Sequence, residues 1–378
     1  MHKILILIDC LSSLDGGAEK CLLRTSETLD RRHYEMQIVS FREPPERTHL
    51  QRFGCPVKVI HLRSCFGFEA MRAAIQLRGL IKREPISVVH TFFPTSDLWG
   101  GLVARLSGCR ILISSRRDMG ILRRRFHRIL YRLLGGMFDQ VQTVSSAVRA
   151  ATIRDDHLDP ERVIVIANGV PLQQVWAPQE KSQLRARYGF GGDSPLLVSI
   201  GSIKPVKGLD ILVRAAARVC REFPTATFLI LGRVAETVYF AQVQALIDEL
   251  GLRGHFRFPG VAEDVFPMLR MCDVFCHLSR SEGFSNAVLE AMACGLPCVV
   301  SDAGGNPEAV SDGWNGFVVP REDADQAAAR MIELLRSPKR ALEMGTRGSE
   351  FVRRRFTTEG MVRQLTEQYD RLLAAKGM

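Results

Sequence analysis

Short apolar runs alternate along this chain with longer segments in which apolar residues recur at helical spacing. Helical patterns separate most of the runs, for example at 206–222 and 237–250. Strands that alternate with helices are typical of βαβ units and a parallel sheet, so the pattern predicts an α/β fold. The predicted strands are 3–8, 36–41, 57–61, 86–90, 110–114, 140–144, 163–166, 196–200, 226–231, 256–258, 274–277, 297–301 and 316–319.

The 378 residues exceed the size of one ordinary core, which favours two domains. The turn-prone Asn168-Gly169-Val170-Pro171 ends the first strand series, and the polar stretch PQEKSQ at 178–183 precedes the second. We therefore predict two Rossmann-like domains, 1–172 and 173–355, followed by a terminal helix at 356–378. Its apolar stripe (Val362, Leu365, Tyr369 and Leu372) must be buried, and the first domain is the expected surface.

Composition indicates a soluble globular protein, with 46% apolar and 24% charged residues. The opening MHKILILIDC is interrupted by Asp9 and reads as a first buried strand rather than a signal peptide. The sequence contains no run of 18 apolar residues, so we do not expect a membrane span. The 10 cysteines include no C-x-x-C, which favours buried, reduced thiols in a cytoplasmic protein.

Positive charge is concentrated in the first half of the chain. Residues 1–178 hold 26 Lys+Arg against 17 Asp+Glu, whereas residues 179–378 hold 25 against 24. Such a surplus suits a polyanion or an anionic membrane surface. Within 110–132 there are eight arginines and one acid, Asp118.

An amphipathic helix is predicted between 122 and 134. Leu122, Phe126, Ile129, Leu130 and Leu133 share one face, and Arg124, Arg125, Arg128 and Arg132 lie opposite or beside it. An ordinary surface helix with a solvated basic face would have this pattern. The alternative, which we favour, is a surface that meets anionic lipid or a lipid-diphosphate acceptor.

Two glycine-containing turns follow predicted strands. Asp15-Gly16-Gly17-Ala18-Glu19-Lys20 comes after the first strand, and Gly201-Ser202-Ile203-Lys204-Pro205-Val206-Lys207-Gly208 comes after 196–200. Glycines let a ligand approach the backbone, and the helix that follows offers N–H groups to an anion. Each turn is equally compatible with a βα connection that binds nothing.

The segment 279–320 carries the clearest chemistry. Ser285 is a good N-cap for a helix at 286–293 that ends near Gly295 and Pro297. Glu282 then lies in the loop before the helix, and Glu290 projects from the helix body about two turns on. The two carboxylates could bond sugar and ribose hydroxyls, while the loop amides of Gly283–Asn286 could meet a diphosphate.

This segment resembles the E-x7-E region of family 4 glycosyltransferases, which have the GT-B fold of two Rossmann-like domains. The likeness extends along the chain. Further matching motifs are GGAEK at 16–20, NGV at 168–170, VKG at 206–208, LG at 231–232 and GGNPEAVSDGWNGFVVP at 304–320.

The resemblance implies transfer of a sugar from a nucleotide donor, with retained anomeric configuration and neither a bound metal nor a cofactor. Lys207 would neutralise the diphosphate leaving group, Glu282 would hold the donor sugar, and Glu290 the ribose. Gly17, Gly283 and the backbone amides of Phe284, Ser285 and Asn286 would also face the donor. By this likeness the two glutamates are not a glycosidase acid and nucleophile.

The sequence departs from the family pattern at two places. Ser202 stands where many members have an arginine, and Lys204 and Arg233 are candidates to replace its charge. Ser114-Ser115-Arg116-Arg117-Asp118 stands where many members have a histidine near the reaction centre. Arg116 and Asp118 are therefore candidate catalytic residues lining the acceptor site, with a structural role as the alternative.

The predicted function is a retaining, nucleotide-sugar-dependent glycosyltransferase that builds a surface polysaccharide or lipid-linked glycan at the inner membrane face. A polyanion-binding protein is one alternative, although no nucleic-acid recognition motif is visible and we expect no nucleic-acid partner. A GT-B enzyme that epimerises a sugar nucleotide is another. The donor base, UDP or GDP, and the acceptor follow no readable pattern.

Overall fold

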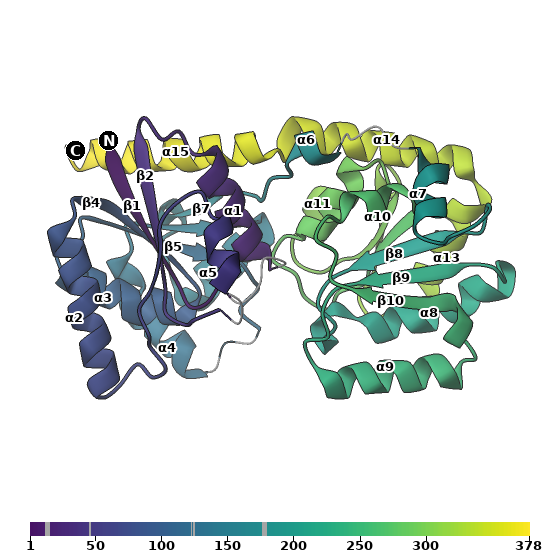
Figure 1. Ribbon diagram of the computed structural model, residues 1–378, viewed down its shortest axis with the longest axis horizontal. Coiled ribbons are helices and arrows are strands. Elements are labelled where there is room, and N and C mark those ends of the chain that lie inside the picture. Colours follow the sequence, from purple (N-terminus) through teal and green to yellow (C-terminus); the bar gives the residue numbers. More distant parts are fainter. Residues whose placement is uncertain (12–15, 45–46, 122, 124, 176–179) are drawn as a thin grey trace. The chain divides into compact units, whose positions relative to one another are not determined.

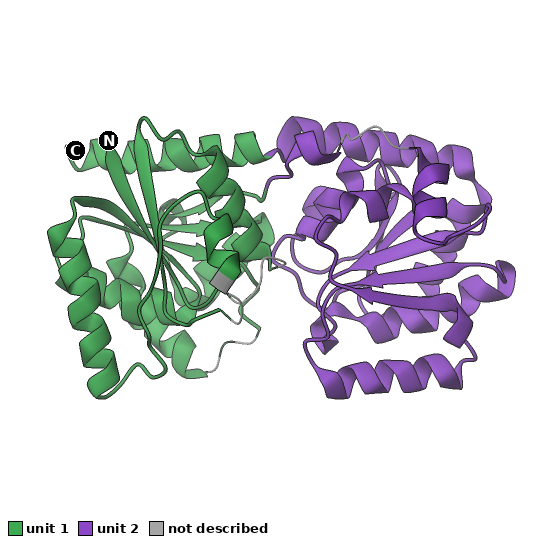
Figure 2. Cartoon of the chain, viewed as in Figure 1, with its two compact units in different colours: residues 1–168, 358–378 green, residues 169–357 purple. Residues whose placement is uncertain are grey.

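The computed structural model describes residues 1–11, 16–44, 47–121, 123, 125–175 and 180–378. These residues form two compact units: unit 1 comprises 1–168 with 358–378, and unit 2 comprises 169–357 (Figure 2). Each unit contains one parallel sheet covered by helices (Figure 1). The predicted fold class, α/β with two Rossmann-like sheets, is confirmed.

Unit 1 has a seven-stranded sheet in the order β3-β2-β1-β4-β5-β6-β7. Its strands are rich in β-branched residues, and the inner strands are buried on both faces, as parallel strands between helices must be, whereas the edge strand β3 is partly exposed. They are β1 (His2–Ile8), β2 (Tyr34–Ser40), β3 (Val57–Val59), β4 (Ile86–Phe92), β5 (Ile111–Arg116), β6 (Gln140–Thr143) and β7 (Val163–Val165).

Helices cover both faces of this sheet. One core cluster joins the sheet to α1 and α15, and the other joins it to α2 and α3. Val362, Leu365 and Tyr369 are buried in the first cluster and Leu372 is partly buried against it, so α15 packs on unit 1. The helices are α1 (Gly17–Thr28), η1 (Arg47–Arg52), α2 (Phe68–Arg83), η2 (Ser96–Gly100), α3 (Gly101–Leu106), α4 (Arg125–Leu134), η3 (Gly135–Met137), α5 (Ser146–Asp156), η4 (Pro160–Arg162) and α15 (Thr358–Ala375).

Unit 2 has a six-stranded sheet in the order β10-β9-β8-β11-β12-β13. The strands are β8 (Leu196–Ile200), β9 (Thr227–Leu231), β10 (Phe256–Gly260), β11 (Val274–His277), β12 (Cys298–Ser301) and β13 (Gly316–Val319). The helices are α6 (Leu172–Val175), α7 (Lys181–Arg187), η5 (Pro205–Lys207), α8 (Leu209–Glu222), α9 (Thr237–Glu249), η6 (Arg253–His255), α10 (Phe266–Arg270), α11 (Asn286–Ala293), α12 (Asn306–Ala309), α13 (Ala324–Arg336) and α14 (Pro338–Arg355).

Both strand orders reverse direction once, between β1 and β4 in unit 1 and between β8 and β11 in unit 2. Loops after the two central strands diverge to opposite faces at such a reversal and leave a crevice at the carboxyl ends, where ligands of open α/β sheets bind. Each of the thirteen predicted strands overlaps a strand of the described chain. Within the described residues, no helix is both long and apolar enough to span a bilayer.

Candidate functional site

The predicted phosphate-binding lysine and the first glutamate of the E-x7-E pair meet at the strand reversal of unit 2. Lys207 ends η5, directly after β8, and Glu282 lies in the loop after β11. The Lys207 ammonium donates to Glu282 Oε1. Two residues 75 positions apart are thereby brought into one ion pair at the carboxyl end of the sheet.

Backbone and arginine contacts hold these two loops together. The Arg280 amide donates to the Val206 carbonyl at 2.9 Å, and its guanidinium donates to the Pro205 carbonyl at 2.7 Å. The same guanidinium pairs with Asp210 of α8 and with Glu322. The position of Glu282 beside Lys207 is therefore fixed by the chain around it.

Glu282 is buried, with 9% of its surface exposed, and three groups converge on its Oε1. Besides Lys207, His277 Nε2 lies 2.6 Å away and Ser279 Oγ donates at 2.9 Å. Burial alone would raise the pKa of this carboxyl, but the charge of Lys207 and the contact with His277 outweigh it and hold the pKa well below its ordinary value. Glu282 is therefore an ionised, oriented acceptor for hydroxyl groups.

Cations gather around the same loop. Burial lowers the pKa of Lys204, and the neighbouring charges of Lys207 and Arg233 lower it further, which places these groups within electrostatic reach of one another. The Ile203 amide donates to the Arg233 carbonyl at 2.8 Å, so the turns after β8 and β9 are adjacent. Ser202, half-buried, lies in the same turn.

Three glycines of the predicted motifs have positive φ and backbone atoms where a side chain would be. A Cβ on Gly208 would lie 2.1 Å from the carbonyl oxygen of Leu278, and a Cβ on Gly232 would lie 2.1 Å from that of Gly201. A Cβ on Gly304 would lie 1.7 Å from the carbonyl oxygen of Glu282. The loops thus approach one another as closely as peptide backbones allow, and glycine is required at each contact.

The helix that carries Glu290 begins as predicted. Ser285 caps α11 by accepting from the Val288 amide, and Gly295 follows its end with φ of +77°. Glu290 is 1% exposed, so its carboxylate lies inside unit 2 rather than on a solvated face. Gly283, Phe284 and Asn286 occupy the loop and the first position of the helix, next to Glu282.

Sequence reasoning missed His277. This residue ends β11, is 3% exposed, and contacts Ser279 and Ser285 as well as Glu282. The available signal was a histidine at the end of an apolar strand five residues before Glu282. A histidine at a strand end is usually structural, so this signal alone did not single it out.

Unit 1 has a pocket of about 180 Å³ at the carboxyl ends of β4 and β5. It contains the predicted Arg116 and Asp118. Its lining consists of Phe93, Pro94, Asp97, Ser115, Arg116, Arg117, Asp118, Arg123, His127 and Tyr131. Aromatic, hydroxyl and charged groups of both signs are the chemistry that binds a polar ligand such as a sugar.

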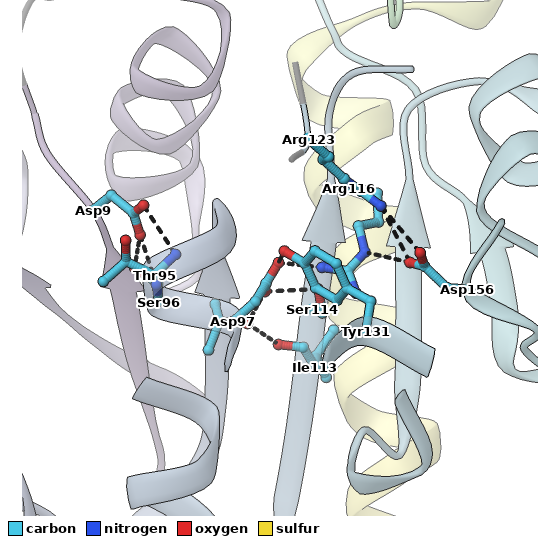
Figure 3. Close-up of polar contacts among 11 residues, drawn as sticks. Asp9, Thr95, Ser96, Asp97, Ile113, Ser114, Arg116, Arg123, Tyr131 and Asp156 are labelled. Atoms are coloured by element: carbon cyan, nitrogen blue, oxygen red, sulfur yellow. Dashed lines mark hydrogen bonds and ion pairs between the residues drawn. The ribbon is translucent and has the colours of Figure 1, made fainter. Parts of the chain in front are cut away.

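Beneath this pocket Arg116 is fully buried between two carboxylates (Figure 3). Its guanidinium pairs with Asp97 and lies 3.5 Å from Asp156, which also pairs with Arg123. Tyr131 stacks on it at 3.8 Å and donates to Asp97 at 2.8 Å. Thr91 and Ser114 complete the shell of Asp97. These contacts favour the structural alternative for Arg116, as the base of the pocket.

The other predicted residues of unit 1 lie nearer the surface. Asp118 is exposed and accepts from the Gly120 amide at 2.7 Å. Gly17 is the first residue of α1. Leu122 and Arg124 of the predicted arginine helix, and Asp15 of the first glycine turn, lie outside the described residues.

The arginine helix forms at α4 and turns its apolar residues outward. Phe126, Ile129 and Leu133 are 56%, 55% and 73% exposed, and Tyr131 is the residue that α4 buries. Arg125, Arg128 and Arg132 are also exposed. An ordinary surface helix would bury its apolar stripe, whereas α4 leaves these three apolar side chains exposed.

Neighbouring helices of unit 1 share this character. Phe66, Phe68, Met71 and Ile75 are exposed on α2 and the loop before it. Leu102 and Leu106 are exposed on α3, which contacts both α2 and η3, the turn directly after α4. The outer surface of this helix layer is thus apolar and basic together.

Two family models match the chain. "Glycosyltransferase Family 4" matches residues 15–174, and "Glycosyl transferases group 1" matches residues 180–351. The first match lies almost entirely in unit 1 and the second lies within unit 2.

Curated relatives carry glycosyltransferase names. The chain is 31% identical over 267 residues to the GDP-mannose-dependent α-(1-6)-phosphatidylinositol monomannoside mannosyltransferase of Mycolicibacterium smegmatis, covering 66% of this chain and 67% of that protein. It is 30% identical over 228 residues to the N-acetyl-α-D-glucosaminyl L-malate synthase of Bacillus anthracis, covering 60% of this chain and 59% of that protein's length. Among solved structures, Anabaena HepE in complex with UDP matches with a TM-score of 0.85 at 22% identity, over 97% of this chain and 99% of that chain.

Proposed function

Because the chain belongs to the family 4 glycosyltransferases, we propose that it transfers a sugar from a nucleotide diphosphate donor to a glycan or lipid-linked acceptor, with retained anomeric configuration. The observation that carries the proposal is the convergence of Lys207, Lys204 and Glu282 at the strand reversal of unit 2. A cationic loop beside an oriented carboxylate suits a diphosphate attached to a hydroxyl-rich sugar. The UDP bound by HepE supports a uridine donor, and the GDP-mannose dependence of the mycobacterial relative supports a guanosine donor.

In this proposal unit 2 binds the donor. Lys207 turns from Glu282 to the diphosphate, with Lys204 and Arg233 supplying the charge that Ser202 lacks. Glu282 accepts from hydroxyls of the donor sugar, Glu290 from the ribose, and the start of α11 faces the phosphates. Gly17 is the first residue of α1 in unit 1, and a donor-binding role for it rests on the family resemblance alone.

The proposed chemistry needs no protein nucleophile. The bond between the anomeric carbon and the diphosphate oxygen breaks while the acceptor oxygen attacks the same face of the sugar. The leaving diphosphate takes the acceptor proton, and Lys207 neutralises the charge that develops on it. Catalysis then consists of positioning and of stabilising the leaving group, with no metal or cofactor assigned a role.

A nucleotide screen tests the proposal. The thermal unfolding midpoint of the purified protein is measured with UDP, GDP, UDP-glucose, GDP-mannose and duplex DNA. A ligand at about 100 times its dissociation constant adds roughly 2.7 kcal/mol to the free energy of unfolding. We expect one nucleotide family to stabilise the protein, and Lys207→Ala to abolish the effect.

Lys181→Ala is the matched control, because it removes another lysine–carboxylate ion pair of unit 2, with Asp273. This variant should respond to the nucleotide like the wild type. Stabilisation by DNA alone would contradict the proposal, and a product formed without acceptor would favour the epimerase alternative.

We also propose that the acceptor reaches the pocket of unit 1 from an anionic membrane surface, at the cytoplasmic face. Exposed apolar side chains on α2, α3 and α4 can enter the lipid boundary, while Arg125, Arg128 and Arg132 meet anionic headgroups. The phosphatidylinositol monomannoside in the name of the mycobacterial relative is consistent with a lipid-borne acceptor.

Vesicle sedimentation tests this surface. We expect the protein to bind phosphatidylcholine vesicles that contain phosphatidylglycerol, and to bind pure phosphatidylcholine vesicles only weakly. The double variant Phe126→Ser with Leu133→Ser should lose this binding. Leu342→Ser removes a similarly exposed apolar residue from α14 of unit 2, and should bind as the wild type does. Equal binding of both variants would contradict the assignment.

A further inference from the structure

His277 has no role in the transfer as proposed so far, yet among the described residues of unit 2 its contact with Glu282 is shorter than the 2.8 Å contact that His255 makes with the Ala226 carbonyl. Its Nε2 lies 2.6 Å from Glu282 Oε1, and the serines at 279 and 285 approach the same nitrogen at 3.1 and 3.2 Å. An ionised carboxylate only accepts hydrogen bonds, so Nε2 carries a hydrogen. The neutral ring or the imidazolium would both satisfy this contact.

Glu282 is the charged group in contact with this ring, and Lys207 pairs with the same carboxylate oxygen. Ser279 donates to the same Oε1, and Ser285 accepts from the Val288 amide, so both are neutral and occupied. Phe275 stacks on the ring at 6.0 Å, and the neighbouring strand β12 places Val300 opposite His277. Lys207 and Lys204 act on Glu282 from the turn after β8.

Glu282 and Lys207 compensate each other in this structure, but donor binding requires Lys207 for the diphosphate. A buried carboxylate that loses its cation is strongly disfavoured, and here it would also face new phosphate charges. Glu282 could keep its charge if a second cation formed beside it. His277 is the titratable group already in contact.

We propose that His277 is a positioning residue for Glu282 that takes up a proton when the donor binds. The proton comes from solvent and forms an N–H bond at Nδ1, since Nε2 already carries its hydrogen. The buried pair of Lys207 with Glu282 is thereby replaced by a pair of His277 with Glu282, and Lys207 is released to the diphosphate. This inference rests on the proposed function, because it requires a nucleotide sugar at this site.

Proton uptake is measured by isothermal titration calorimetry in buffers of different ionisation enthalpy. The probe is UDP-glucose or GDP-mannose, whichever stabilises the wild type, because a diphosphate esterified at both ends lacks the second phosphate ionisation at about pH 6. We expect wild-type uptake of a large part of one proton near pH 7.5. Donor affinity should fall as the pH rises, by up to about tenfold per pH unit.

His277→Gln supplies a donor to Glu282 that does not titrate. It should bind the donor at pH 8.5 within about threefold of the wild type, with uptake near zero and a flat pH profile. His277→Leu, which lacks the hydrogen bond, should bind more weakly at every pH. His255→Gln removes a half-exposed histidine elsewhere in unit 2 and should retain wild-type uptake.

The outcomes separate the two proposals. Unchanged uptake or an unchanged pH profile in His277→Gln would overturn the role of His277 and leave the glycosyltransferase proposal intact. A wild-type protein that binds no nucleotide sugar would overturn the proposed function, and the inference with it. Thermal unfolding of each variant identifies a folding defect, and if His277→Leu fails to fold, the comparison of His277→Gln with the wild type still decides.

Discussion

The carbonyl oxygen of Glu282 occupies the space that a side chain at Gly304 would need. Gly304→Ala would place its Cβ 1.7 Å from that oxygen, at a φ of +54°. We expect the substitution to lower the free energy of unfolding by about 2–5 kcal/mol, from left-handed backbone strain and overpacking together. It should also weaken nucleotide binding, because the loop that holds Glu282 must move. Urea unfolding and the nucleotide screen measure the two effects.

Gly313→Ala separates the effect of left-handed backbone strain from that of the close contact with a neighbouring carbonyl oxygen. Gly313 has a φ of +72° but no atom within 4 Å of the added Cβ. This variant should lose only about 1–2 kcal/mol, the strain of a left-handed alanine, and bind nucleotide normally. Equal losses in the two variants would mean that the contact with Glu282 does not matter.

Residues whose role depends on neighbours in the chain could be predicted, and residues whose role depends on distant partners could not. Ser285 was predicted as an N-cap because capping involves the next three residues. The burial of Arg116 depends on Asp97, Tyr131 and Asp156, up to 40 positions away, and no spacing rule reports them. His277 was missed for a different reason: Glu282 is only five positions away, but the contact depends on how the loop between them folds and follows no regular helix or strand spacing.

At the scale of an element, α15 is tied to the sheet of unit 1 through a buried histidine. Tyr369 of α15 bonds His90 Nδ1 at 2.9 Å, in the middle of β4. Burial, aided by the nearby charge of Arg117, lowers the pKa of His90 to about 3. The unfolded chain, with an ordinary pKa of about 6.5, therefore binds a proton that the native protein excludes.

This difference makes α15 docking sensitive to acid. The contribution of His90 to the free energy of unfolding is fully present above about pH 6.5. It falls by up to about 1.4 kcal/mol per pH unit as the pH drops towards 3. His90→Asn, which keeps a hydrogen-bonding group near Nδ1, should be less stable at pH 7.5 by about 1–2 kcal/mol. Its stability should change less between pH 6.5 and 4.5. Urea unfolding across this range tests the prediction, with the exposed His61→Asn as the control that retains the wild-type slope.

The type of each element could be predicted more reliably than the face it buries. Runs of β-branched residues predicted the strands, because a strand buried between helices leaves that signal in the sequence itself. The amphipathic pattern of α4 predicted a helix and left two interpretations of its apolar face open, but it gave no sign that Tyr131 would face inward. Tyr131 is buried because Asp97 and Arg116 bind it, and their positions depend on the folded sheet.

For the whole molecule, the uneven charge and the two strand reversals suggest that the two units bind different ligands. Residues 1–178 hold 26 basic and 17 acidic residues, and the exposed apolar helices α2, α3 and α4 all belong to unit 1. The convergence of Lys204, Lys207 and Glu282 belongs to unit 2. Nucleotide and lipid should therefore act on different parts of the chain.

Hydrogen exchange measured by mass spectrometry tests this division. We expect the stabilising nucleotide to slow amide exchange most at 201–208 and 278–290, since ligand contacts suppress local opening. Vesicles with phosphatidylglycerol should slow it most at 66–75 and 125–134, where apolar side chains would leave water. Lys207→Ala should lose the first effect and keep the second, and Phe126→Ser with Leu133→Ser should do the reverse. Strongest nucleotide protection at 110–134 would instead assign the anion site to unit 1 and contradict the proposed arrangement.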